Sequence, residues 1–340
     1  MLGCLSLCRN CVYPSFSAGW DPIQQLAADA QAARFNALAQ STKKNLLTHL
    51  RSYLMFVIYF GLTPFPISED NLIVYIQFLS RNFKSVSSIK NYAFGLQTIS
   101  HLHGFQFPDL SLPHFKLQFK GLARHLSHTV SRATPLTPLI LTSVFNVLDM
   151  SCPLHVSMWA VMVSGFFLFA RIGNLLPKSS SNWDVSKQLT RSDVFVASDS
   201  IIFVLKWTKT IQTHERVLQV PLSAAPGNPL CPKQALLNMI KISPGSSQDH
   251  LFSYSSPSGQ KVITQYSFTK FLRQKLHLCG YNYHGFSGHS MRRGGATHAF
   301  ASGVQSELIK SHGDWRSDAY QVYLDFSLSD RLITTQKMLD

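Results

Sequence analysis

Two segments of the chain carry basic residues in a pattern suited to binding a phosphate. His289 and Arg292 are three residues apart, so on a helix they share a face and both can contact one phosphate. The N-terminus of such a helix adds backbone N–H donors for an anion. Arg171 follows the wholly apolar run 165–170, where an arginine must be solvated, paired or bound to an anion. Simpler explanations remain open on these residues alone: a solvated basic helix face, and an arginine that caps helix carbonyls.

Two tyrosines near the C-terminus, Tyr320 and Tyr323, are candidate nucleophiles. A phenol has a pKa of about 10, so it needs a base and an activated phosphate before it can attack. Leu324 and Phe326 follow Tyr323, and tyrosines more often pack than react. On sequence alone, core packing is therefore the competing interpretation.

Taken in order, Arg171, the His289/Arg292 pair and Tyr323 resemble the catalytic pattern of the tyrosine recombinases, the phage-integrase family. The resemblance covers essentially the whole chain after residue 20. Three segments carry it: 165–176, 201–222 and 284–326.

Two motifs are most similar to the eukaryotic mobile-element branch of that family, the DIRS, Ngaro and Crypton recombinases. They are Gly288-His289-Ser290-Met291-Arg292-Arg293-Gly294-Gly295-Ala296-Thr297 and Gly313-Asp314-Trp315-Arg316-Ser317-Asp318-Ala319-Tyr320. This similarity implies a transposable-element protein located in the nucleus.

The resemblance implies a site-specific DNA recombinase or integrase that cuts and rejoins DNA through a covalent 3′-phosphotyrosine. Two arginines would clamp the scissile phosphate, a histidine would take the tyrosine proton, and a hairpin lysine would protonate the leaving 5′-oxygen. No metal or other cofactor is expected. The implied catalytic residues are Arg171, Lys209, His289, Arg292, Trp315 and Tyr323.

Several of these assignments have competitors nearby. Lys206 lies three residues before Lys209. The family's second His/Trp position falls on Asp314, and the adjacent Trp315 is preferred because its indole N–H can donate to a phosphate. Tyr323 stands at the family's distance from that position, and Tyr320 is three residues early.

One position departs from the family pattern. An acid normally follows the first arginine closely, and Asn174 takes its place here. The salt bridge that supports Arg171 in the family is therefore expected to be absent or replaced.

The N-terminal part of the chain has a helical pattern. After an irregular leader, 1–20, we expect a bundle of about four helices over 21–127, with Ser41 and Ser68 as helix caps. The resemblance implies that this is the family's DNA-clamping, core-DNA-binding (SAM-like) domain. A segment with two prolines near 132–138 ends this domain.

The catalytic domain is expected at 133–340, so the fold class is mainly α with a small three-stranded antiparallel β-sheet. The strands are predicted at 194–197, 201–207 and 217–221, with 208–215 as a hairpin connection. Helices are predicted at 137–150, 154–176, 233–240, 264–278, 290–301, 306–311 and 318–326.

Composition favours a polyanionic partner. The 340 residues include 31 Lys+Arg and 17 Asp+Glu, a net charge of +14. Such an excess favours nucleic acid, because each neutralised phosphate releases counterions. The apolar run from Met158 to Ala170 is shorter than the about 20 residues that cross a bilayer, so no membrane is expected. We expect double-stranded DNA as partner, and a homo-oligomer, a tetramer on paired DNA sites.

Three alternatives compete with this interpretation. A decayed or domesticated recombinase would bind DNA without catalysis. A type IB topoisomerase-like enzyme would use similar chemistry as a monomer. Cys4, Cys8 and Cys11 have the spacing of an iron–sulfur loop, but only helical patterns follow, so chance spacing is favoured. Six scattered cysteines do not form a disulfide framework and indicate a reducing compartment.

Overall fold

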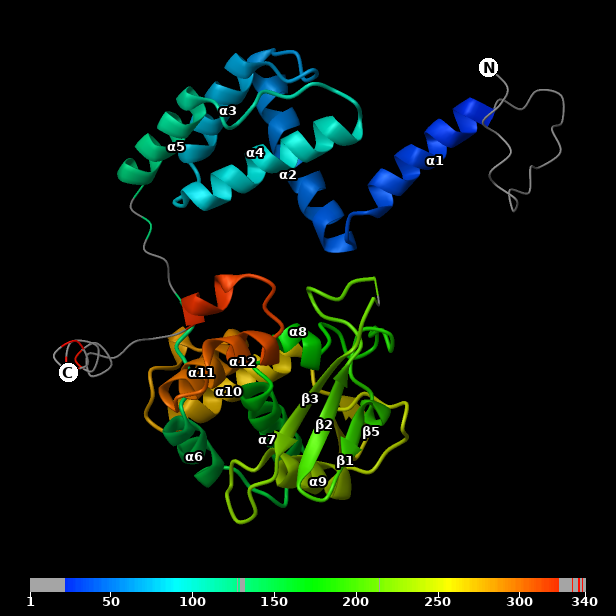
Figure 1. Ribbon diagram of the computed structural model, residues 1–340, viewed down its shortest axis with the longest axis vertical. Helices are drawn as coiled ribbons and strands as arrows, with labels where there is room; N and C mark the ends of the chain where they lie inside the picture. Colours follow the sequence, from blue (N-terminus) through cyan, green and yellow to red (C-terminus); the bar gives the residue numbers. More distant parts are fainter. Residues whose placement is uncertain are drawn as a thin grey trace. The chain divides into compact units, whose positions relative to one another are not determined.

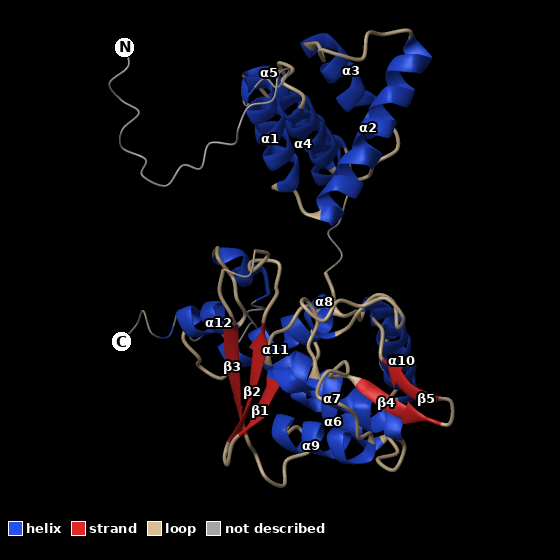
Figure 2. Ribbon diagram, turned by 90° about the vertical axis from the view of Figure 1, so that its right-hand side faces the viewer, coloured by secondary structure: helices blue, strands red, loops and turns tan. Residues whose placement is uncertain are grey.

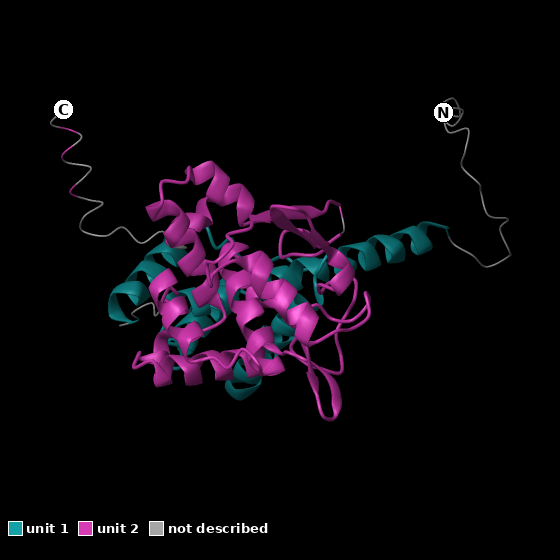
Figure 3. Cartoon of the chain, turned by 90° about the horizontal axis from the view of Figure 1, so that it is seen from below, with its two compact units in different colours: residues 1–130 teal, residues 131–340 magenta. Residues whose placement is uncertain are grey.

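The computed structural model describes residues 22–126, 128, 132–213 and 215–323, with isolated positions at 332, 336 and 338. Cys4, Cys8 and Cys11 lie outside the described residues. The chain divides into two compact units, 1–130 and 131–340, which are coloured separately in Figure 3. Each unit has its own apolar core.

Every secondary-structure element in the described part of unit 1 is a helix, as predicted, but there are five helices where about four were expected. Its helices are α1 (Pro22–Asn36), α2 (Gln40–Phe60), α3 (Glu69–Ser80), α4 (Val86–Leu102) and α5 (Pro113–His125). Its core includes Tyr53 and Tyr75, whose rings meet edge to face with centroids 5.2 Å apart.

The two predicted helix caps of unit 1 have different outcomes. Ser68 does cap α3, because its hydroxyl accepts a hydrogen bond from the Asn71 N–H. The prediction for Ser41 is wrong: α2 begins at Gln40, and Ala39 occupies the cap position without a side-chain hydrogen bond.

Unit 2 is built around α7 (Pro153–Phe167), which is buried from Val156 to Phe166. A helix that is apolar on every side must be surrounded by other elements. In Figure 2, α7 lies between a three-stranded sheet and a two-stranded sheet. Four other helices of this unit are α6 (Pro138–Asn146), α9 (Pro232–Ile242), α10 (Gln265–Leu278) and α11 (His289–Ala301).

The predicted three-stranded antiparallel sheet is confirmed. It contains β1 (Val194–Val196), β2 (Ser200–Leu205) and β3 (Leu218–Ser223) in the order β1-β2-β3. Phe203 pairs with Val220, and Ile201, Phe203 and Leu205 alternate into the core. The loop between β2 and β3, residues 206–217, we call the β2–β3 hairpin loop.

A second, two-stranded sheet was not predicted. It pairs β4 (Ser253–Ser256) with β5 (Gly259–Val262). Its strands are mostly serine, glycine and polar residues, so they lack the β-branched and aromatic alternation that indicates a strand.

The predicted continuous helix 154–176 is wrong, because the chain breaks between α7 and a short helix, α8 (Ile172–Leu175). At the break, Phe169 has φ +46°, a left-handed conformation that a bulky residue rarely adopts. Figure 1 shows α8 next to α11 and α12 (Ser306–His312).

The last described element is a 3₁₀ helix, η4 (Asp318–Tyr323). The predicted α-helix 318–326 is therefore 3₁₀ up to Tyr323, and residues 324–326 lie outside the described part of the chain. Among the described residues, no helix combines the length and apolar character needed to span a bilayer.

Candidate active site

Helix α11 carries His289 and Arg292, and its position depends on two glycines. A Cβ at Gly294 would lie 1.9 Å from the Leu136 carbonyl oxygen, and one at Gly295 would lie 2.0 Å from the Phe166 carbonyl oxygen. Both contacts are far closer than real Cβ atoms allow. Glycine at both positions therefore lets α11 sit directly against neighbouring backbone on two sides.

The segment 132–136 is hydrogen-bonded along this helix. The Leu136 N–H donates to the Ser290 carbonyl at 3.1 Å, and Arg293 Nη1 donates to the Ala133 carbonyl at 3.0 Å. Just before α11, the Gly285 carbonyl accepts from the Thr134 N–H at 2.8 Å. The start of unit 2 is thus bonded to the helix that carries the two candidate residues.

Arg292 is a buried arginine whose guanidinium is hydrogen-bonded to two backbone carbonyls. Its side chain is among the largest that are fully buried, and the residue is 2% exposed. Nη2 donates to the Gly313 carbonyl at 2.8 Å, and Nη1 donates to the Phe169 carbonyl. The Trp315 ring covers one face, with Cζ 3.6 Å from the ring centroid. These contacts fix the plane and direction of the guanidinium.

The two backbone segments that hold Arg292 share an unusual conformation. Phe169 has φ +46° and Asp314 has φ +55°, and they are the two non-glycine residues with positive φ in the described chain. Such conformations cost roughly 1–3 kcal/mol each and persist where the surrounding structure imposes them. The Phe169 carbonyl itself accepts a hydrogen bond from Arg292. Asp314 directly follows Gly313, whose carbonyl accepts the other.

Arg171 stands at the start of α8, as its N-cap residue. Ile172 packs on Gly288, where a Cβ would come within 2.7 Å of the Ile172 side chain, so Arg171 and His289 flank a close contact. Arg171 Nη1 is buried and has no hydrogen-bond partner among the described residues. Asn174 is buried and accepts no bond from this guanidinium; its own N–H donates to the Arg171 carbonyl at 2.8 Å.

His289, the first residue of α11, lies within the field of both arginines. Desolvation lowers its pKa from the usual value, and the positive charges of Arg292 and Arg171 lower it further. The imidazole is therefore neutral at pH 7 and can accept a proton.

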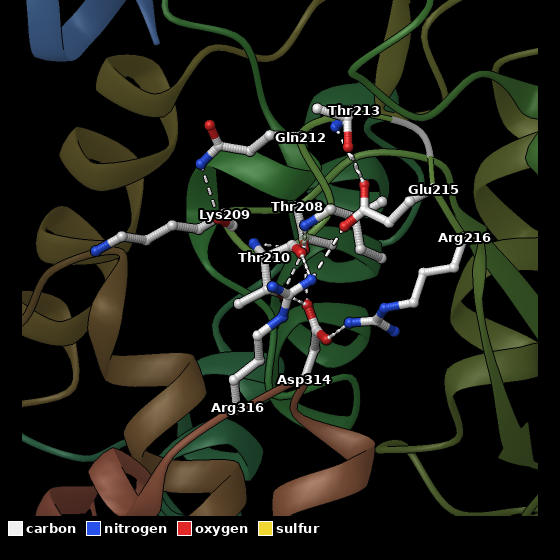
Figure 4. Close-up of polar contacts among 10 residues, drawn as sticks. Thr208, Lys209, Thr210, Gln212, Thr213, Glu215, Arg216, Asp314 and Arg316 are labelled. Atoms are coloured by element: carbon white, nitrogen blue, oxygen red, sulfur yellow. Dashed lines mark hydrogen bonds and ion pairs between the residues drawn. The ribbon is translucent and has the colours of Figure 1, made fainter. Parts of the chain in front are cut away.

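The β2–β3 hairpin loop is bonded to the turn that follows α12. Asp314 accepts from the Thr208 hydroxyl at 2.6 Å, and also from Thr210 and Arg216. Figure 4 shows these groups converging on one buried carboxylate. Arg316 adds a bond to the Thr210 carbonyl and an ion pair with Glu215 at 3.0 Å.

The two candidate lysines differ in their partners. Lys206 forms an ion pair at 2.6 Å with Asp193, whose side chain is 5% exposed. Lys209, in the hairpin loop, is exposed and forms no ion pair among the described residues. Its side chain extends away from the Asp314 carboxylate in Figure 4.

The remaining candidates lie next to Arg292. Trp315 is 7% exposed and packs against Phe169 and Tyr320. Tyr320 is 6% exposed, with its ring centroid 6.2 Å from that of Trp315, so it is a packing residue. Tyr323 ends η4, and the placement of its side chain lies outside the described part of the structure.

The structure thus brings Arg171, His289, Arg292 and Trp315 together at the joint of α8, α11 and the turn after α12. Sequence reasoning did not anticipate the Asp314 hydrogen bonds or the two carbonyls that hold Arg292. A signal for the former was available in the two threonines that flank Lys209. In the described part of the chain, no cluster of three or more His, Cys, Asp or Glu side chains could hold a metal ion.

Sequence comparisons do not assign this chain to a family. No profile of a known protein family matches it, and no curated protein matches it.

Several solved structures, in contrast, share its fold. The Tn1549 transposon integrase (residues 82–397) in complex with circular intermediate DNA has a TM-score of 0.56 and 14% identity, covering 92% of this chain and 98% of that one. A lambda integrase (75–356) dimer bound to a COC′ core site has a TM-score of 0.53 and 15% identity, covering 91% and 95%.

The site-specific recombinase XerH, bound to its difH substrate in a pre-cleavage complex, has a TM-score of 0.51 and 15% identity. The match covers 81% of this chain and 72% of XerH. The helical N-terminal unit and the mainly helical second unit with its small antiparallel sheet therefore have the fold of the tyrosine recombinases and integrases.

Proposed function

We propose that the protein is a site-specific DNA recombinase that cuts and rejoins DNA through a covalent 3′-phosphotyrosine. The observation that carries the proposal is the pair of guanidiniums beside His289. Arg292 is held rigidly, and Arg171 has a buried Nη1 without a partner. A buried donor without a partner is costly, and a phosphate oxygen supplies the acceptor that this site lacks.

Each candidate has a role consistent with its surroundings. Arg171 and Arg292 bind the non-bridging oxygens of the scissile phosphate, where charge builds up during transfer. Trp315 holds the face of Arg292, and its indole N–H is proposed as a further phosphate donor.

The proposed reaction balances without a cofactor. The Tyr323 oxygen attacks phosphorus and gives its proton to His289, which is neutral at pH 7. The new bond between phosphorus and the tyrosine oxygen forms as the bond to the 5′-oxygen breaks. That oxygen keeps the bonding electrons and takes a proton from Lys209. Rejoining is the reverse of these transfers.

The proposed partner, DNA, is supported by the net charge of the chain and by the structurally similar proteins. The net charge of +14 favours double-stranded DNA, and the lambda integrase neighbour is a dimer on DNA. We propose a tetramer on paired DNA sites, acting in the nucleus as a mobile-element recombinase.

Covalent trapping tests the proposal. Duplexes bound by the protein are first selected from a random pool, then rebuilt with a nick near each candidate cleavage position so that rejoining is blocked. The expected result is a protein–DNA adduct that survives SDS in wild type and Tyr320→Phe, and is lost in Tyr323→Phe.

Other outcomes would point elsewhere. DNA binding with no adduct from wild type would contradict catalysis and favour a decayed or domesticated binder. An adduct formed by a monomer on a single site, with no assembly of paired sites, would favour a topoisomerase-like relaxing enzyme.

A further inference from the structure

Both residues that flank Lys209 are bonded to one carboxylate oxygen. The hydroxyls of Thr208 and Thr210 each donate to Asp314 Oδ2, the former at 2.6 Å. The other oxygen, Oδ1, accepts from Arg216 at the end of the same loop. Asp314 therefore binds the hairpin loop at three points.

The backbone at Lys209 is tightly folded. The Thr208 N–H donates to the Ile211 carbonyl at 3.1 Å, and the Ile211 N–H returns a bond at 3.3 Å, so Lys209 and Thr210 form the tip of a short turn. The Gln212 side-chain amide also donates to the Lys209 carbonyl at 2.8 Å. The main chain of Lys209 is held by these bonds, while its side chain is exposed and extends away from Asp314 (Figure 4).

The same turn of backbone also holds the buried arginine. Gly313, whose carbonyl accepts from Arg292 at 2.8 Å, directly precedes Asp314. Two adjacent residues thus connect the phosphate-binding guanidinium of α11 to the loop that carries Lys209.

We propose that Asp314 is a positioning residue for Lys209, holding the hairpin loop so that the lysine ammonium reaches the phosphate that Arg292 contacts. This inference rests on the proposed function and assigns Asp314 a role in leaving-group protonation. Asp314 occupies the position where the resemblance led us to expect a group that touches the phosphate, but its carboxylate is turned to the hairpin loop instead.

The carboxylate is suited to this task because it stays ionised. Burial alone would raise the pKa of Asp314, but hydrogen bonds from Thr208, Thr210 and Arg216 outweigh it and lower the pKa from its usual value. It thus remains a hydrogen-bond acceptor for all three donors at pH 7.

A change of leaving group tests this role. In a nicked substrate with sulfur in place of the bridging 5′-oxygen, the leaving group is a thiolate. A thiol has a pKa of about 8.5, against about 15.7 for water, so departure needs no proton donor. The measured quantity is the ratio of cleavage rates on the sulfur and oxygen substrates, which does not depend on the fraction of folded protein.

For Lys209→Ala, we expect cleavage of the oxygen substrate to fall by roughly 100- to 10,000-fold, with most of the loss restored by sulfur. For Asp314→Asn, we expect a loss of roughly 10- to 100-fold on the oxygen substrate, because the donor is displaced rather than removed. Sulfur should restore this loss as well, so the ratio rises above that of wild type.

Three further variants separate a specific effect on Lys209 from a general loss of folded protein. Thr210→Val removes one donor to Asp314 and should raise the ratio, whereas Thr210→Ser keeps a hydroxyl and should not. The matched control is Asp193→Asn, which also removes a buried carboxylate bonded to a threonine and a lysine but does not touch Thr208 or Thr210. Its ratio should equal that of wild type.

The outcomes separate the two proposals. No adduct from wild type on either substrate would overturn the proposed function itself. Cleavage by wild type, with Asp314→Asn and Thr210→Val slow on both substrates by the same factor, would leave the recombinase intact and refute the positioning role. A sulfur effect in Lys206→Ala rather than in Lys209→Ala would also refute it.

Discussion

The two arginines of the site, Arg292 and Arg171, differ in their burial and in the hydrogen-bond partners of their guanidiniums. Arg292 is 2% exposed, held by two backbone carbonyls and covered by the Trp315 ring. Arg171 stands at the start of a helix of four residues, and its buried Nη1 has no partner among the described residues. The Arg292 guanidinium is fixed by the protein itself, whereas the Arg171 guanidinium keeps one buried N–H for which the described residues offer no acceptor.

This difference indicates that the two arginines contribute to the site in different ways. Arg292 joins the α7–α8 break, α11 and the turn after α12, so it organises the site before a ligand arrives. For the buried Nη1 of Arg171, the proposed phosphate would be the acceptor that the described residues do not provide. In the proposed site both arginines bind the phosphate, but only Arg292 also holds three segments of the fold together.

The largest effect is expected for Arg292→Gln. Losing the guanidinium leaves two buried carbonyls without a donor, so the free energy of unfolding should fall by about 3 kcal/mol or more. Adduct formation should fall below detection. Urea unfolding and the trapping assay measure the two quantities, and an inactive variant with wild-type stability would show that Arg292 is not a framework residue.

Arg171→Gln should separate activity from stability. Removing one charged donor to the phosphate should slow adduct formation by roughly 100- to 1,000-fold, with a change in unfolding free energy within about 0.5 kcal/mol. The control is Arg191→Gln, a half-buried arginine bonded to the Ser243 carbonyl, which should lose stability and keep its cleavage rate per folded molecule. A large stability loss in Arg171→Gln would remove the contrast between the two arginines.

The salt dependence of DNA binding should show a smaller effect of the Arg171 substitution. If Arg171 contacts one phosphate, Arg171→Gln should reduce the slope of log affinity against log salt by about 0.9. Fluorescence anisotropy on one duplex at several salt concentrations gives the slope. An unchanged slope would mean that Arg171 neutralises no phosphate.

The smallest effect concerns the pH profile. Desolvation and the charges of Arg292 and Arg171 lower the pKa of His289, so the neutral base persists as pH falls past about 6.5. Adduct formation should therefore decline only below that pH. Arg171→Gln removes one of the two charges, so the acid limb should move upward toward 6.5, and a downward shift would contradict the proximity of the two residues.

Local patterns in the sequence predicted much of the fold. The alternation of Ile201, Phe203 and Leu205 indicates a half-buried strand, and the spacing of His289 and Arg292 places both on one helix. Each of these features is decided by residues close together in the sequence. For the same reason, the resemblance could be drawn from short motifs, although identity to the three solved structures described above is only 14–15%.

Features decided by distant residues were missed. The run through Phe169 contains nothing that ends a helix locally, yet the chain turns there, with its carbonyl bonded to Arg292 and its ring against Gly295. The Asp314 hydrogen bonds span about a hundred residues of sequence. Such contacts leave no periodic signal, so only the folded structure reveals them.

The glycine contacts of α11 have a consequence for protein engineering. Because segment 132–136 lies against Gly294 and is bonded to Ser290 and Arg293, it belongs to the same rigid piece as the helix of His289 and Arg292. A chimera that exchanges unit 1 for another domain should therefore be joined before residue 132, because a junction inside the segment would replace residues that contact α11 and are hydrogen-bonded to it.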